Sequence, residues 1–185
     1  MLTEFRISLR NFPLFKAILC SNADRYSQFQ QLTYDPPYVM IAANHMDGRN
    51  RKDTCTNIEQ TGEFVWNMAT YDLREAVNKT AAVLKGDEFE FAGLTKEPSK
   101  LVKPWRVKES PIQFECKLYT SLHLPGASVP GRVDVIIGRV VGVHIASRAI
   151  NEDGLIDLPK LKPIARCGYY QYSVVERVCI RLLTC

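Results

Sequence analysis

Apolar and polar positions along the chain form several short runs that are typical of β-strands separated by turns. The run Tyr38–Ala43 is apolar and lies between a proline pair and a polar segment, as expected of a buried strand. The run Arg132–Ile145 is long and rich in β-branched residues, and Gly138 and Gly142 interrupt it where a strand can bend at a barrel corner. Further strands are predicted within residues 107–119, broken near Pro111, and over residues 168–175. Strands outnumber helices and the connections are short, so the expected fold is mainly β, a largely antiparallel sheet coiled into a barrel.

Two segments carry the signals of helices. Asp53 or Thr54 can cap a helix that continues through Gln60, and Gly62 is placed to end it. A second helix is predicted over Tyr71–Ala82, whose first residues have capping-box spacing and whose apolar residues share one face.

The first of these helices begins directly after a short basic loop. Arg49, Arg51 and Lys52 precede it, and two threonine hydroxyls lie in its first turn. A helix N-terminus has unpaired N–H groups and a partial positive charge, so this combination suits a phosphate. A short basic loop is also the usual form of a solvated connection, and the carboxylate of Asp53 would compete for the same donors. Both interpretations stay open on these residues alone.

Composition and charge agree with a single soluble domain. Of the 185 residues, 46% are apolar and 24% are charged, close to the average for globular proteins. A chain of this length buries roughly 70% of the surface that its unfolded form exposes, so it needs neither a metal nor a disulfide for stability. The net charge of +4 is modest and does not predict a nucleic-acid-binding protein. No run approaches the ~20 apolar residues of a membrane-spanning helix, so no membrane span is expected.

The six cysteines are spread along the chain and form no C-x-x-C pair. This spacing argues against a zinc site or a thioredoxin-like site. They indicate reduced thiols in a cytoplasmic protein, and Cys116, inside an apolar strand, is expected to be a small core residue.

Five segments, in the order of the chain, together resemble one known family. They read DPPYVMIAANH from residue 35, KDTCTNIEQTGEFVWNMA from residue 52, DEFEFAGLTKEPSKLVKPWRVKESPIQFECKLY from residue 87, VDVIIGRVVGVHI from residue 133 and LKPIARCGYYQY from residue 161. With these segments the chain resembles the flavin reductase-like family of FMN-binding split barrels, over about Tyr26 to Glu176. The resemblance implies a split barrel of antiparallel Greek-key type that binds FMN, forms a homodimer and transfers hydride or electrons between NAD(P)H and flavin.

The two ends of the chain depart from the family pattern. Family members open with a β-hairpin, of which only the tail is matched here, by Tyr26–Phe29, so this hairpin is expected to be missing or replaced. We therefore divide the chain into a divergent N-terminal segment (residues 1–25), a split-barrel domain (26–176) and a divergent C-terminal tail (177–185). Within the first segment, Phe5–Cys20 is interpreted as a short amphipathic helix or a disordered tail, and only faintly resembles an organellar presequence.

The resemblance also assigns residues to a flavin site. The matched positions near the ring, near the phosphate end and across the cleft are Ser27, Gln28, Ala43, Asn44, Lys52, Asp53, Thr54, Asn57 and Arg166. Each has an alternative without a ligand: Asn44 can cap a turn, Ser27 can bond the backbone, and Arg166 can pair with a surface carboxylate. His45 lies close to the expected cleft and is a further candidate ligand, whereas His123 and His144 are expected to be structural, and Trp66 to be a packing residue.

No residue is assigned a catalytic role, because the flavin would supply the hydride chemistry. Three functions fit the resemblance: an FMN-dependent NAD(P)H oxidoreductase, a non-catalytic FMN-binding protein, or a truncated family member that cannot hold flavin because the barrel lacks two strands.

Overall fold

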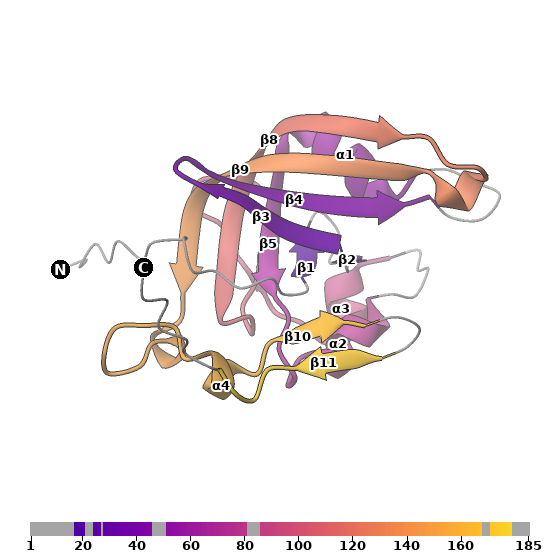
Figure 1. Cartoon of the computed structure of the whole chain (residues 1–185). Helices are drawn as coiled ribbons and strands as arrows, with labels where there is room; N and C mark the ends of the chain where they lie inside the picture. Colours follow the sequence, from indigo (N-terminus) through magenta and orange to yellow (C-terminus); the bar gives the residue numbers. More distant parts are fainter. Residues whose placement is uncertain are drawn as a thin grey trace, which may run out of the picture.

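The computed structural model describes residues 17–20, 24–26, 28–45, 51–80, 86–167 and 171–178, with side chains from Gln28 onward (Figure 1). The strands are β1 (Ala17–Cys20), β2 (Asp24–Tyr26), β3 (Gln28–Tyr34), β4 (Pro37–Asn44), β5 (Glu63–Met68), β6 (Lys96–Glu97), β7 (Arg106–Val107), β8 (Ile112–Leu124), β9 (Val133–Ile145), β10 (Ile164–Arg166) and β11 (Tyr172–Val174). The α-helices are α1 (Asp53–Thr61), α2 (Arg74–Lys79), α3 (Glu88–Ala92) and α4 (Leu158–Leu161), and 3₁₀ turns occupy Val129–Gly131 and Ser147–Ala149.

The main sheet has seven strands in the order β2-β1-β5-β8-β9-β4-β3, and every neighbouring pair is antiparallel. β2 also lies near β4, so the sheet curls around toward closure. Below it in Figure 1 lie the two-stranded sheet β10-β11 and the helices α2, α3 and α4. The predicted mainly β, antiparallel barrel is confirmed.

β9 bends as its glycines predicted. The β8–β9 register shifts near both Gly142 and Gly138, and the strand turns downward at the left of Figure 1. At Gly138 a Cβ atom would lie 2.4 Å from the ring of Phe64, which is fully buried. Glycine at this position therefore lets the bent strand approach an aromatic ring that a larger residue would displace.

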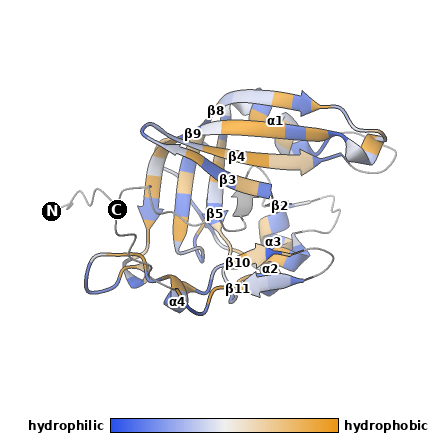
Figure 2. Cartoon of the chain, in the orientation of Figure 1, coloured by the Kyte–Doolittle hydropathy of each residue, from blue (hydrophilic) through white to orange (hydrophobic). Residues whose placement is uncertain are grey.

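The core has two parts, one inside the curled sheet and one below it. In the first, Trp66 is fully buried and stacks between Phe29 and Phe114, with ring centroids 4.7 Å apart in both pairs. Trp66 is therefore a packing residue, as predicted, and Cys116 is buried in the same cluster. The second part lies against α2, α3 and β10 and consists of Val65, Val77, Phe89, Val107, Ile164 and their neighbours. Apolar residues recur along β4, β8 and β9, as Figure 2 shows.

The first helix was predicted correctly in extent but not in its cap. α1 ends at Gly62, whose φ of 71° is the left-handed conformation expected of a glycine C-cap. The N-cap is Lys52, with no side-chain capping bond, so the prediction of Asp53 or Thr54 as the cap is wrong. The helix begins one residue earlier because the Lys52 carbonyl already accepts the N–H groups of Cys55 and Thr56.

The second helix is shorter at its start than predicted. α2 begins at Arg74, because Thr70 and Tyr71 accept the N–H groups of Leu73 and Arg74 in a turn. The buried side chain of Leu73 anchors this turn, so packing sets the start and not the capping-box spacing. Residues 81–82 of the predicted helix lie outside the described residues.

The ends of the chain add strands to the fold. Ala17–Cys20 pairs with both β2 and β5, so these four residues are a strand and not part of the short helix that was an alternative for Phe5–Cys20. The predicted last strand is β11, Tyr172–Val174, which pairs with β10; Gly168 to Tyr170 of that prediction lie outside the described residues. None of the described helices is long and apolar enough to span a membrane.

Candidate functional site

Two of the predicted flavin contacts lie together on the outer face of the main sheet. The side-chain nitrogen of Gln28 donates to the Asn44 side-chain oxygen over 3.2 Å, and the Asn44 nitrogen donates to the carbonyl of Pro130 over 3.3 Å. Both residues are exposed at neighbouring strand ends, Gln28 on β3 and Asn44 on β4. Two primary amides at neighbouring exposed strand ends can offer both donors and acceptors to a polar ring system.

The Ala43 side chain points to the opposite, core-facing side of the sheet. Successive residues of a strand alternate between faces, and the Ala43 side chain is packed into the core, 3% exposed. It pairs in register with Asp134 of β9. Ala43 can therefore contact a ligand on the outer face only through its backbone.

The predicted phosphate-binding residues form the first turn of α1. Thr54 is buried, Asp53 is exposed and Asn57 is partly buried one turn later. Within the described residues, the backbone N–H groups of Asp53 and Thr54 have no hydrogen-bond acceptor. A helix N-terminus with open N–H groups beside Lys52 suits an anionic group.

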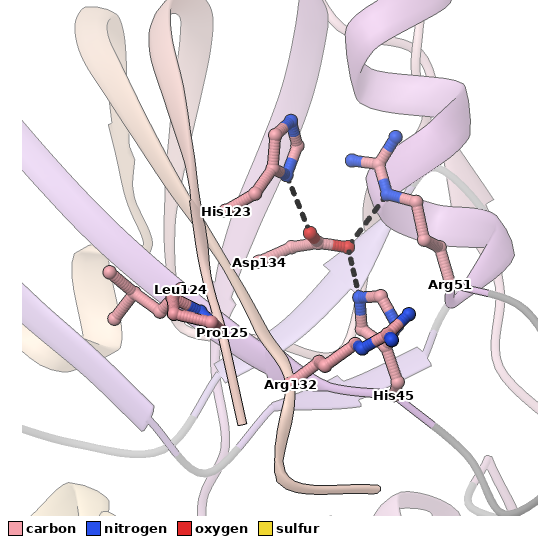
Figure 3. A pocket seen from close by; sticks show the side chains of 7 residues that line it. All are labelled: His45, Arg51, His123, Leu124, Pro125, Arg132 and Asp134. Atoms are coloured by element: carbon pink, nitrogen blue, oxygen red, sulfur yellow. Dashed lines mark hydrogen bonds and ion pairs between the residues drawn. The ribbon is translucent and has the colours of Figure 1, made fainter. Parts of the chain in front are cut away.

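A buried carboxylate joins this helix to the end of β4. Asp134, 1% exposed, accepts hydrogen bonds from Arg51 Nε at 2.8 Å, from His123 Nδ1 at 2.7 Å and from His45 Nε2 at 3.2 Å (Figure 3). An ionised carboxylate only accepts hydrogen bonds, so both histidine nitrogens donate to it. Burial alone would raise the pKa of Asp134, but the bonds from Arg51, His123 and His45 outweigh this effect and hold the pKa below its usual value.

Arg51 is bound by a second carboxylate as well. Its two terminal nitrogens donate to the two oxygens of Glu59 over 2.6 and 2.7 Å, a bidentate ion pair. The bond to Glu59, opposed by partial burial and supported by Asp134, raises the pKa of the Arg51 guanidinium above its usual range. The positive charge of the predicted basic loop is therefore partly neutralised, because Glu59 and Asp134 both form ion pairs with Arg51. Arg49 lies outside the described residues.

A cavity of about 420 Å³ opens beside this cluster. Its lining residues are His45, Arg51, His123, Leu124, Pro125, Arg132 and Asp134 (Figure 3). The volume lies within the range of small-molecule sites, roughly 300–1,000 Å³. The candidate ligand His45 thus does line a cavity, although its Nε2 is already bonded to Asp134.

Of the remaining predicted residues, one lies in the smaller sheet and one lies outside the described residues. Arg166 is on β10 in the smaller sheet, and its guanidinium lies over the ring of Tyr172, 5.6 Å from the centroid. Ser27 lies outside the described residues. The residues that the sequence analysis missed are Asp134 and Glu59, together with the bonded role of His123. The one signal for Asp134 is an acidic residue inside the apolar run VDVIIG.

Comparison with known proteins places these features in a family. Residues 20–163 match the family described as the flavin reductase like domain. The chain is 34% identical over 155 residues to YwrF of Bacillus subtilis (strain 168), covering 82% of this chain and 75% of that protein.

Solved structures agree with this match. Component B of nitrilotriacetate monooxygenase from Bacillus cereus superimposes with a TM-score of 0.81 at 31% identity, over 92% of this chain and 87% of that one. A Shewanella frigidimarina protein, assigned as a flavin reductase with a split barrel domain, superimposes with a TM-score of 0.75 at 26% identity, over 92% and 86%. The chain therefore belongs to the flavin reductase-like family, and its fold is the split barrel of that family.

Proposed function

We propose that the protein binds FMN and acts as an oxidoreductase that moves hydride or electrons between NAD(P)H and flavin. The observation that carries this proposal has two parts. The outer-face amide of Asn44, at the end of β4, is hydrogen-bonded to that of Gln28 on β3, and Asp134 connects the end of β4 to the N-terminus of α1. The names of the two similar structures, a monooxygenase component and a protein assigned as a flavin reductase, support redox chemistry.

The donor set fits the two ends of FMN. The open N–H groups of Asp53 and Thr54, with the Lys52 ammonium beside them, match the phosphate dianion. The amides of Gln28 and Asn44 match the carbonyl and N–H edge of the flavin ring, which both donates and accepts. The exposed Asp53 carboxylate is the one group of the set that opposes an anion, and its side chain must point away from a bound phosphate.

The protein residues would bind and orient the cofactor, which when bound supplies the hydride chemistry. Lys52 and the first turn of α1 would fix the phosphate, and Asn44 and Gln28 would orient the ring. Arg166 has no assigned contact to these groups, so its role in binding a flavin or a nicotinamide nucleotide is a separate part of the proposal.

The outer face of the sheet supports a homodimer as part of the same proposal. Leu122 and Leu124 of β8 are 49% and 50% exposed there, and they pair in register with Val135 and Val133 of β9. Asn44 pairs with Val133 on the same face. A second copy that covered this apolar face would also approach the flavin site from outside.

Flavin titration of wild-type protein and of the variants Lys52→Ala and Asn44→Ala tests the proposal. FMN fluorescence quenching gives the Kd. The loss of absorbance at roughly 340 nm, where the reduced nicotinamide absorbs, then reports NADH or NADPH oxidation. We expect wild-type protein to bind FMN and Lys52→Ala to bind it about tenfold more weakly, because a charge-assisted contact to the phosphate is lost.

The matched control is Lys160→Ala, which removes an exposed lysine from α4, outside the site. It is expected to leave FMN affinity unchanged. Wild-type protein that does not bind FMN contradicts the proposal, and binding without NAD(P)H oxidation selects the non-catalytic flavin-binding protein instead.

A further inference from the structure

The Asp134 carboxylate is the point where three segments of the proposed flavin site meet. Asp134 itself is on β9, in register with Ala43 and one residue from the partner of Asn44. It binds His45 directly after β4, Arg51 two residues before α1, and His123 near the end of β8. The β4–β9 and β8–β9 registers already place His45 and His123 near this carboxylate, so the segment that it can position is the one before α1, through Arg51.

Arg51 extends this connection along α1. Its Nε binds Asp134 on β9, and its two terminal nitrogens bind Glu59 in the second half of the helix. One planar guanidinium therefore bridges a fixed strand and the body of the helix. A bidentate pair of this kind fixes orientation as well as distance.

Three of the five N–H donors of Arg51 bind carboxylates, and its charge is paired with both Asp134 and Glu59, so Arg51 is poorly placed to bind a phosphate itself. Lys52, the next residue, is the N-cap of α1, so a displacement of Arg51 would displace Lys52 as well. A change at Arg51 or Asp134 should therefore move the phosphate-binding turn without removing any group that touches the phosphate.

We infer, on the basis of the proposed function, that Asp134 and Arg51 are positioning residues which hold the first turn of α1 at the correct distance from the end of β4 for a flavin that carries a phosphate. The pair thereby determines the preference for FMN over riboflavin, which has the same ring and ribityl chain but no phosphate. The histidines His45 and His123 complete the hydrogen bonds of the carboxylate and hold it in place.

Binding of FMN and of riboflavin to wild-type protein and to Arg51→Gln, measured as two Kd values for each protein, tests this inference. Arg51→Gln removes the cation that joins β9 to α1 and leaves every proposed flavin contact in the chain. We expect the Kd for FMN to rise about tenfold, as when a charge-assisted bond is misplaced, while the Kd for riboflavin changes less than about twofold. Arg51→Lys, which can keep one ion pair, should have a Kd for FMN between that of wild-type protein and that of Arg51→Gln.

Asp134→Asn gives a second, independent break of the same connection. It keeps the shape of the side chain but removes the charge that Arg51 and the two histidines share. We expect the same selective loss of FMN binding, with circular dichroism and chemical denaturation showing that each variant is folded under the conditions of binding.

The matched control is Arg74→Gln, which removes an exposed arginine paired at 3.5 Å with Glu75 on α2. It should change neither Kd. An equal loss of FMN and riboflavin binding in Arg51→Gln and Asp134→Asn would show general structural damage and overturn the inference, as would no loss at all. Wild-type protein that binds neither flavin overturns the proposed function itself, which separates the two failures.

Discussion

A single buried carboxylate can organise a loop, and Glu115, the fourth residue of β8, does so. Glu115 is fully buried and accepts the backbone N–H groups of Lys100, Leu101 and Val102 at 2.9, 2.6 and 3.0 Å. His144 Nε2 donates to the same carboxylate. His144 was expected to be structural, and the structure shows which group it supports. Burial would raise the pKa of Glu115, but the bonds from Lys100, Leu101 and His144 lower it below its usual value.

We predict that Glu115→Gln destabilises the protein by about 1–3 kcal/mol at pH 7, because an amide offers one acceptor oxygen where two are used. The pKa of Glu115 is lower in the folded chain than in the unfolded chain, so its contribution is complete above the unfolded value of about 4.3 and is lost as the pH falls toward the folded value. The difference in unfolding free energy between wild type and variant, measured in urea at several pH values, should therefore shrink below about pH 4.

The unfolding free energies are compared at constant ionic strength, and one result would contradict this prediction. A difference that stays the same from pH 7 to pH 3 would mean that the charge of Glu115 contributes nothing and that only its shape matters.

At the scale of helices and strands, the sequence predicted those features that depend on the local residues alone. The apolar run that became β4 and the glycine that ends α1 were predictable because burial and left-handed backbone conformation depend on the residues themselves. The start of α2 was not predictable, because the buried side chain of Leu73 and not the capping pattern sets it. In the site, Lys52 and Asn44 were predicted because they match family motifs, whereas no motif predicted Asp134.

The cluster around Asp134 shows why part of a site stays out of reach of sequence reasoning. His45, Arg51, His123 and Asp134 come together only through the β8–β9 and β4–β9 registers. A shift of one residue in either register would send these side chains to the opposite faces of the sheet. Sequence patterns indicate that strands exist, but they do not give the pairing of strands that are distant along the chain.

The bend in β9 gives a prediction at the same scale. Gly138→Ala should destabilise the protein by about 1–3 kcal/mol, because the new Cβ would lie 2.4 Å from the buried Phe64 ring. Chemical denaturation measures the change. Gly142→Ala is the control, since its nearest contact is the Leu101 side chain at 3.1 Å, and Leu101 is 56% exposed and can move. Equal losses for the two variants would contradict a specific role of the Phe64 contact.

At the scale of the whole molecule, the outer face of the main sheet carries several exposed apolar side chains. Leu122 and Leu124 lie on it beside Val133, and Tyr119 of the same strand is 67% exposed and packs edge-on against Tyr38. Exposed apolar patches of this kind are typical of protein–protein interfaces. The proposed homodimer would cover this patch.

We predict that Leu122→Asp converts a dimer to a monomer and lowers FMN retention at the same time, because a charge on the covered face has no partner. Light scattering after size-exclusion chromatography gives the mass, and absorbance gives the bound flavin. Leu155→Asp is the matched control, since Leu155 is 64% exposed in the turn between Asn151 and Ile156, away from the sheet. Wild-type protein that elutes as a monomer would contradict the proposed dimer.

The pairing of Arg51 with two carboxylates also has a kinetic consequence. Formal charges close to the candidate site balance among the described residues, with Arg51, Lys52 and Arg132 against Asp53, Glu59 and Asp134. A balanced set produces little field beyond a Debye length, roughly 8 Å at physiological ionic strength. An anionic ligand would reach this site by ordinary diffusion, without long-range steering. Selectivity at the site would then come from differences in the dissociation rate of the ligand and not in its association rate.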